Sequence, residues 1–343
     1  MIQKLISYTL AKVKKSRFIL NLIEKPINLS AFPVTGKFTD SYNNEFILRE
    51  GLRSRVKPGW QSYFNQTYSD AAISKEMTKQ IAANGRMAVE KVESLVNCFA
   101  GGLANKVILE IGCHAGGVTY AFSEKSALKV TGTDYSEYKT SSTTDAREQN
   151  VTDYLFNLRS SVRENFPLAT VVDFRNDDIC NSSLPDNTYD IVCSWDVLEH
   201  IHAPEDAFKH IQRILKNGGV TIHTYNPFFC LNGGHSPCTL DFPWAHAVLN
   251  AADFERYNNE IQPGRKEKSM SFYKNGLNRM TLKDMKQYFT EAGLRIEAII
   301  PYIKEQHIRM VDARTLTCAK RNYPGLEMED LVSSQVIIIA RKG

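Results

Sequence analysis

From Lys106 to the C-terminus, short apolar runs alternate with amphipathic segments. Continuous apolar runs of this length are typical of strands covered on both faces, and their alternation with helical patterns indicates βαβ units. We therefore predict an α/β fold in which a Rossmann-like, seven-stranded, mostly parallel sheet has helices on both faces. Five strands are expected at residues 107–111, 129–133, 170–174, 189–194 and 220–224.

The two remaining strands follow a helix with clear end signals. Thr281 is a good N-cap, and Gly293 supplies a left-handed residue after a helix that ends near Ala292. Residues 294–300 and 335–340 complete the predicted sheet. Another helix is expected over 204–216, where apolar residues recur at helical steps.

Two regions lie outside this pattern. Residues 1–100 show helical patterning broken by a Pro-Gly turn, and residues 226–280 are rich in aromatics, histidine and turn formers. The second stretch is longer than an ordinary connection. We predict a helical N-terminal extension over 1–100 on the substrate side and a core over 101–343, with the insertion 226–280 as a substrate lid.

The N-terminal segment is amphipathic and basic, with Ile2, Leu5 and Leu10 on one stripe and Lys12 near its end. Charges interrupt every apolar run that could serve for export or for membrane spanning. Such a helix can lie on an anionic membrane, but packing against the protein's own core is the commoner fate. We expect no integral membrane segment.

Charge and cysteine content narrow the classes of partner. The chain has 42 basic and 38 acidic residues, a balance too even for a dedicated nucleic-acid binder, so we expect a small-molecule substrate and no nucleic acid. The seven cysteines are scattered without a C-x-x-C pair, which favours a reducing, cytoplasmic location. The sequence is compatible with a homodimer.

A nucleotide-like ligand fits the turn after the first strand. Glu110 stands near the end of that strand, and Gly112, Gly116 and Gly117 follow in a turn that leads to a helix. Glycine allows close backbone approach, and a helix N-terminus offers free N–H groups. Asp134 ends the second strand about twenty residues later, where a carboxylate can accept hydrogen bonds from ribose hydroxyls.

With these residues the chain resembles the class I S-adenosylmethionine-dependent methyltransferase superfamily, over about 106–225 and 281–343. His114 stands where the family usually has its middle glycine. Lys216-Asn-Gly-Gly and Ala292-Gly-Leu match two further turns of the family. The resemblance implies S-adenosylmethionine as cofactor and a final antiparallel strand. It implies these cofactor-binding residues: Glu110, Gly112, His114, Gly116, Gly117, Asp134, Tyr135, Asp178, Ile179, Ser194, Trp195 and Asp196.

Asp178 is assigned to the adenine amino group, with Asp177 and Asp173 as close rivals. His200, which follows the fourth strand, is the first candidate for a catalytic base toward a hydroxyl acceptor, and His235 and His246 are the alternatives. The resemblance thus implies methyl transfer to a small molecule, and family frequency favours a hydroxyl of a sugar-containing or secondary metabolite.

Other interpretations are weaker. Cys230, His235, Cys238 and His246 match no paired-ligand spacing, so we predict no metal site. The Asn226-Pro-Phe-Phe element follows the fifth strand and not the fourth, which disfavours nucleic-acid N-methylation. An NAD-dependent oxidoreductase would share Asp134 but should show G-x-G-x-x-G. A non-catalytic binding module stays open because of His114.

Overall fold

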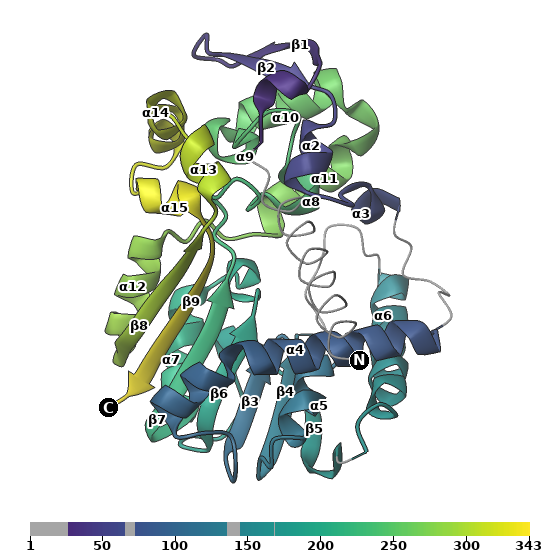
Figure 1. The fold of residues 1–343 in the computed structure, drawn as a ribbon, viewed down its shortest axis with the longest axis vertical. Coiled ribbons are helices and arrows are strands. Elements are labelled where there is room, and N and C mark those ends of the chain that lie inside the picture. The colour runs from purple at the N-terminus through teal and green to yellow at the C-terminus, as the bar shows by residue number, and fades with distance from the viewer. Residues whose placement is uncertain (1–26, 66–72, 136–144, 168) are drawn as a thin grey trace, which may run out of the picture.

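The computed structural model describes residues 27–65, 73–135, 145–167 and 169–343. A seven-stranded sheet with the order β5-β4-β3-β6-β7-β9-β8 forms the centre of the protein (Figure 1). Strands β3 to β7 run parallel, whereas β9 lies antiparallel between β7 and β8. The sheet confirms the predicted fold. Its strands are β3 (Val107–Ile111), β4 (Lys129–Asp134), β5 (Val172–Asn176), β6 (Tyr189–Trp195), β7 (Leu215–Tyr225), β8 (Leu294–Ile303) and β9 (Ser333–Lys342).

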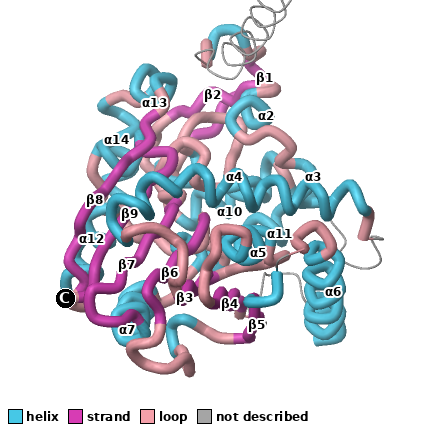
Figure 2. The backbone as a smooth tube through the Cα atoms, turned by 60° about the horizontal axis from the view of Figure 1, so that its bottom comes forward, coloured by secondary structure: helices cyan, strands magenta, loops and turns pink. Residues whose placement is uncertain are grey.

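Neighbouring residues of each strand are buried on opposite faces of the sheet. Ile108 and Ile339 pack under α4 (Lys75–Ala100), α5 (Gly117–Ser123) and α6 (Asp145–Arg163). Leu109 and Ile338 pack under α7 (Pro204–Ile214) and α12 (Leu282–Glu291). Both views show α4 lying across its face of the sheet (Figures 1 and 2). Because both faces are covered, the strands are continuous apolar runs, as the sequence predicted.

The cap, a second apolar cluster, lies beyond the carboxyl ends of the parallel strands (Figure 1). It joins the residues before α4 to the insertion after β7 and to the segment between β8 and β9. Its elements are β1 (Val34–Thr39), β2 (Glu45–Arg49), α2 (Leu52–Val56), α3 (Gln61–Asn65), α8 (His235–Cys238), α9 (Ala245–Val248), α10 (Ala251–Ile261), α11 (Lys266–Asn275), α13 (Glu305–Met310), α14 (Ala313–Asn322) and α15 (Met328–Val332).

The helical interpretation of the N-terminal hundred residues is wrong for residues 34–49. β1 and β2 pair as an antiparallel hairpin, and its buried Phe38 and Leu48 pack into the cap. The Asp40 carboxylate accepts the N–H groups of Tyr42 and Asn44 and so fixes the turn. Alternation over only five or six residues per strand is a short signal, which explains why helical patterning around it dominated the prediction.

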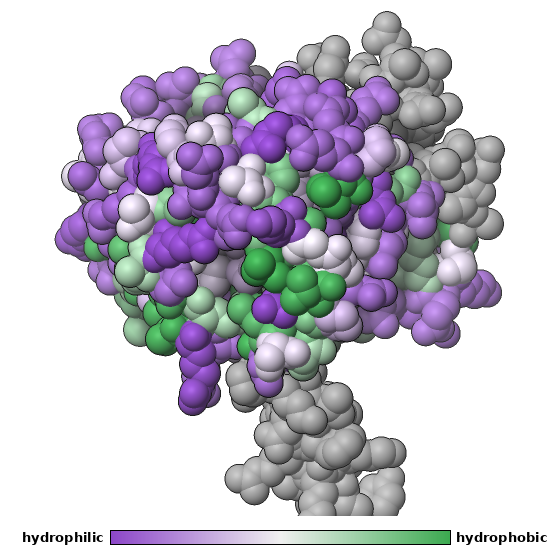
Figure 3. All heavy atoms as spheres, turned by 90° about the horizontal axis from the view of Figure 1, so that it is seen from above, coloured by the Kyte–Doolittle hydropathy of each residue, from purple (hydrophilic) through white to green (hydrophobic). Residues whose placement is uncertain are grey.

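Short 3₁₀ turns connect several elements: η1 (Leu29–Ala31), η2 (Ala169–Val171), η3 (Ile179–Asn181), η4 (Leu198–His200) and η5 (Pro263–Arg265). Seen from the cap side, the surface is mostly hydrophilic with an apolar area near the centre of the view (Figure 3). Among the described residues, no helix is long and apolar enough to cross a membrane. The predicted amphipathic N-terminal helix lies outside the described residues.

Candidate active site

A cavity of about 370 Å³ opens at the carboxyl ends of the parallel strands, where the strand order reverses between β3 and β6. Ligands of open α/β sheets bind at such switch points, and the volume is within the range of small-molecule pockets. Its lining comes from the turns after β3, β4, β5 and β6: Ile111, Gly112, His114, Asp134, Tyr135, Asp177, Asp178, Ile179, Cys180, Trp195, Asp196, Val197, His200, Ile201 and His202.

The glycines of the first turn have different roles. Gly112 lines the cavity with φ +70°, and a Cβ there would lie 2.5 Å from a methyl carbon of Val197. Gly116 has φ +76° and faces the Phe174 ring, whereas Gly117 faces the α4 backbone at Ile81. Of the three glycines, only Gly112 lines the cavity. The other two glycines allow the turn and α5 to pack closely.

Asp134 is held at the end of β4 by the glycine turn itself. Its Oδ2 accepts the His114 N–H at 2.8 Å, and its Oδ1 accepts the Tyr135 N–H at 3.0 Å. Arg159 of α6 lies 3.4 Å from the same Oδ2 and donates to the His114 carbonyl at 2.6 Å. His114 adopts φ +43°, the left-handed conformation that glycine adopts at lower cost.

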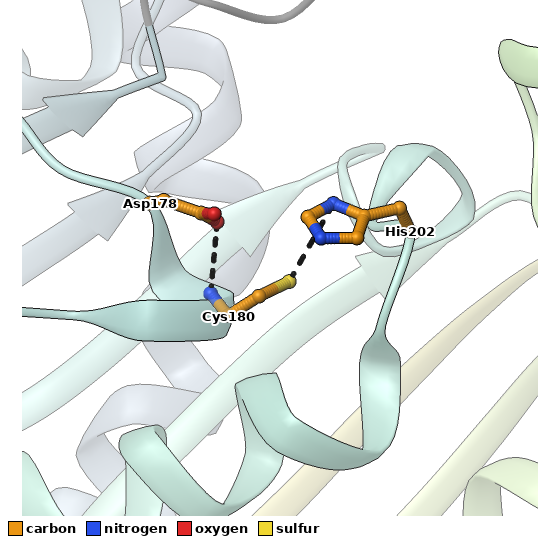
Figure 4. Close-up of side chains that lie close together, drawn as sticks. All are labelled: Asp178, Cys180 and His202. Atoms are coloured by element: carbon orange, nitrogen blue, oxygen red, sulfur yellow. Dashed lines mark hydrogen bonds between the residues drawn. The ribbon is translucent and has the colours of Figure 1, made fainter.

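The opposite end of the cavity is built on η3. Asp178 caps this turn, because its Oδ1 accepts the Cys180 N–H at 2.9 Å (Figure 4). The Cys180 sulfur points toward His202 Nδ1, 3.9 Å away. Burial raises the pKa of Cys180 to about 12, so the thiol stays protonated at neutral pH. Asp178, Cys180 and His202 therefore form a poor metal site, because the thiol is protonated and the carboxylate already accepts a backbone N–H.

Two buried polar atoms in the cavity wall indicate which ligand chemistry the cavity can accommodate. Asp177 Oδ2 and Trp195 Nε1 have no hydrogen-bond partner among the described residues, and both residues line the cavity. An unpaired buried acceptor and donor cost free energy unless a ligand or water meets them. A base with an exocyclic amino group and ring nitrogens has the complementary chemistry. The cavity therefore fits the nucleoside part of S-adenosylmethionine.

Four predicted cofactor residues do not line the cavity: Gly116 and Gly117, described above, and Ser194 and Glu110. Ser194 is buried, and its hydroxyl oxygen lies 2.7 Å from Nδ1 of the buried His223. Glu110 is buried beneath the turn, where the Thr119 hydroxyl donates to it and burial raises its pKa to about 8. Side chains alternate between the two faces of a strand, so a motif position at a strand end does not by itself place its side chain in the site.

Of the three candidate bases, only His200 lines the cavity. Its Nδ1–H donates to the Gly276 carbonyl at 2.7 Å, and burial lowers its pKa, so the ring is neutral near pH 7 with its lone pair on Nε2. His235 lies next to it, with ring centres 5.1 Å apart. His246 is fully buried in the cap, where its Nε2–H donates to the carbonyls of Phe228 and Cys230.

The sequence did not identify Arg159 or Glu199 as site residues. Arg159 lies 25 residues after Asp134 on another helix, and nothing in its local sequence marks the contact. Glu199 precedes His200 directly, and the adjacent acid and imidazole were the one available signal. The cysteines and histidines weighed as a zinc set, Cys230, His235, Cys238 and His246, do not form a ligand cluster within the described part of the chain.

Comparison with known proteins places this geometry in a family. Residues 84–299, well over half of the chain, match the family described as "Methyltransferase domain". No curated protein sequence matches the chain.

Solved structures with a similar fold include a putative S-adenosylmethionine-dependent methyltransferase from Listeria monocytogenes (17% identity, 76% of this chain and 99% of that chain, TM-score 0.46). A putative methyltransferase from Bacillus halodurans covers 74% of this chain and 99% of its own, at 18% identity and TM-score 0.41. Geranyl diphosphate C-methyltransferase from Streptomyces coelicolor, solved with Mg²⁺, geranyl diphosphate and S-adenosyl-L-homocysteine, has 10% identity, 80% and 87% coverage and TM-score 0.44. None of these likenesses bears on the acceptor.

Proposed function

Because the chain belongs to the methyltransferase domain family, with the class I fold whose methyl donor is S-adenosylmethionine, we propose that it methylates a hydroxyl of a small molecule. The acceptor class we favour is a sugar-containing or secondary metabolite. The observation that carries this proposal is the cavity in which Asp134, the unpaired Asp177 Oδ2 and His200 face one space. The antiparallel β9 also separates the sheet from the dinucleotide-binding strand order.

In this proposal, residues at opposite ends of the cavity bind the ribose and the adenine of the cofactor. Asp134 is pre-oriented to accept hydrogen bonds from the ribose hydroxyls, because the His114 and Tyr135 amides fix both of its oxygens. Asp177 and Asp178, at the other end, are acceptors for the adenine amino group. The unpaired Oδ2 favours Asp177, whereas Asp178 already accepts a backbone N–H.

When bound, S-adenosylmethionine supplies an electrophilic methyl group on a sulfonium, so the protein need only align a nucleophile and exclude water. His200 lies at the acceptor side of the cavity, neutral and with its Nδ1–H anchored to Gly276. In this proposal its Nε2 takes the proton of the acceptor hydroxyl. General-base assistance of this kind contributes about 10²- to 10⁴-fold to rate.

The cap is the proposed recognition element for the acceptor. The insertion 226–280 lies over the carboxyl edge of the sheet and brings His235 beside His200. Residues 27–65 pack on the insertion, while α4 packs on the sheet, so the N-terminal hundred residues contribute to both parts. A lid role for 226–280 would exclude water from the reacting atoms.

Calorimetric titration with S-adenosylhomocysteine, with NAD as the comparison ligand, tests the cofactor assignment. We expect one site for the nucleoside and no heat with NAD. Asp134→Ala should weaken binding by about 1–3 kcal/mol, or roughly 5- to 150-fold in Kd, since charge-assisted hydrogen bonds are lost. The matched control is Asp206→Ala, an exposed carboxylate on α7 paired with Lys209. Equal affinities for both variants and the wild type would remove Asp134 from the site.

The acceptor class is tested by assaying methyl transfer from labelled S-adenosylmethionine to a panel of hydroxylated, aminated and carbon-nucleophile small molecules. Transfer to oxygen acceptors with a turnover that depends on His200 supports the proposal. Exclusive transfer to nitrogen or carbon would refute it while leaving the family intact.

A further inference from the structure

Glu199 is a buried carboxyl group that makes no well-formed side-chain hydrogen bond among the described residues. Its side chain is 0% exposed, and neither of its oxygens accepts a well-formed hydrogen bond among the described residues. Burial raises the pKa of Glu199, and the nearby backbone N–H groups of Glu199 and Asn226 only partly oppose that effect. The residue lies in η4, directly before His200 and next to the cavity. Burying a carboxylate without a compensating contact costs several kcal/mol, so such groups either stay protonated or bind a cation.

His235 presents a second unpaired atom to the same carboxylate. Its Nε2 is buried without a hydrogen-bond partner and lies 4.0 Å from Glu199 Oε1. This separation is too long for a hydrogen bond. Two ligands at about 2.1 Å from one metal ion lie at most about 4.2 Å apart, so the gap has the size that a cation would bridge.

His200 completes the group, because one ligand atom from each of Glu199, His200 and His235 lies within 4.8 Å of the others. The Nδ1–H of His200 donates to the Gly276 carbonyl, which leaves the lone pair on Nε2. A hydrogen bond from the second ring nitrogen to a carbonyl is the usual support of a metal-bound histidine.

We propose that Glu199, His200 and His235 bind one divalent transition-metal cation at the acceptor end of the cavity. Two imidazoles and one carboxylate form the donor set that suits Zn²⁺, Mn²⁺, Fe²⁺ or Co²⁺, and three protein ligands leave a position open. Mg²⁺ prefers oxygen ligands and is disfavoured. The sequence predicted no metal here, because its three ligands come from two segments 35 residues apart.

Lys57 is the competing counter-charge for the carboxylate. Its ammonium attracts Glu199 and Asp196, yet no ion pair joins Lys57 to Glu199 in the described part of the chain. No hydrogen bond joins Lys57 to His235 Nε2 in the described part of the chain, so Lys57 does not satisfy that atom either.

The metal site deepens the proposed function and rests on it for its role. A cation held by these three ligands would bind an acceptor hydroxyl at its open coordination position. It would lower the pKa of that hydroxyl, as metal ions do for bound water. With a metal bound, His200 would be a ligand in place of the general base of the metal-free proposal, and the hydroxyl proton would leave to solvent water. Metal binding itself needs no cofactor, so it can be tested alone.

Titrating the chelator-treated full chain with Co²⁺ and following the visible d–d absorption tests this site, and calorimetry with Zn²⁺ and Mn²⁺ adds affinities. We expect one ion per chain. Glu199→Gln and His235→Gln should each weaken binding at least about tenfold, whereas His210→Gln, a histidine of α7 outside the group, should not. Thermal unfolding of each variant shows whether it is folded.

Three results would overturn the proposal: no stoichiometric binding, binding that survives both ligand substitutions, or binding that Cys180→Ser abolishes instead. S-adenosylhomocysteine is titrated into the same metal-free samples. If the nucleoside binds and no metal does, the metal site is refuted and the methyltransferase proposal stands. If the metal binds and the nucleoside does not, the methyltransferase proposal is refuted and the metal site stands.

Discussion

Replacing Gly85 with alanine separates helix propensity from close packing. Gly85 lies inside α4, where alanine is ordinarily more favourable by about 1 kcal/mol. In this protein an added Cβ would lie 2.2 Å from the Gly117 carbonyl oxygen and 2.3 Å from its carbon, both backbone atoms of α5. Backbone cannot move aside by a rotamer change, so α4 must shift away from α5.

The expected cost follows from that contact. Overpacking typically destabilises by about 1–3 kcal/mol, which exceeds the propensity gain, so Gly85→Ala should lower the free energy of unfolding. Because Gly117 opens α5 beside the glycine turn, the shift should also weaken S-adenosylhomocysteine binding. Urea unfolding at 25 °C measures the first effect, and calorimetry measures the second.

Asn84→Ala is the matched control, an exposed neighbour on the same helix. It should change stability by no more than about 0.5 kcal/mol, as surface substitutions usually do. If Gly85→Ala were as stable as the wild type or more so, the two helices would not be in backbone contact, and the packing role assigned to Gly117 would be wrong.

Three further substitutions test the site and its surroundings. His200→Ala should lower turnover about 10²-fold or more with little change in S-adenosylhomocysteine affinity, and an unchanged rate removes it from the reaction. His246→Ala should reduce stability with no effect on metal binding, in contrast to His235→Ala. Burial raises the pKa of Glu110 to about 8, so the stability that this group contributes is present in acid and declines as pH rises toward 8. Urea unfolding at pH 5 and pH 8 should show a smaller decline for Glu110→Gln than for the wild type. The exposed Glu90→Gln should leave the decline unchanged.

The sheet could be predicted because burial on both faces leaves a local trace. The run Val107–Ile111 is apolar at every position except Glu110, and its bounds match β3 as observed. The cap left no such trace. Its core joins residues from before α4, from the insertion and from 313–331. Each segment is only partly apolar, and its apolar side chains are buried only when the other segments pack against it. Long-range assembly of this kind has no local period to detect.

For the site, the sequence located strand ends but not side-chain directions. Asp134 and Trp195 end their strands and reach the cavity, as expected. Ser194, one residue before Trp195, points to the opposite face and contacts His223. Glu199 shows the converse, because only the folded chain reveals that its carboxyl group is buried beside His235 without a well-formed hydrogen bond.

The turn that carries Glu199 and His200 is fixed from the end of the insertion. Asn278 donates its side-chain amide to the carbonyls of Leu198 and Ile201 at 2.6 and 2.9 Å, and its backbone N–H to the Glu199 carbonyl at 2.8 Å. Asn278→Ala removes the two side-chain bonds, which leaves the Ile201 carbonyl without this partner and the Leu198 carbonyl with only the Ile201 N–H at 3.4 Å, at about 1–3 kcal/mol.

Because the adenosyl end of the cavity lies on other turns, the same substitution should lower kcat and metal affinity but leave the Kd for S-adenosylhomocysteine within about twofold. Asn275→Ala, at the end of α11, is the control with the same chemistry. A loss of nucleoside binding equal to the loss of kcat would mean that η4 supports the whole cavity, and the division between a cofactor end and an acceptor end would have to be abandoned.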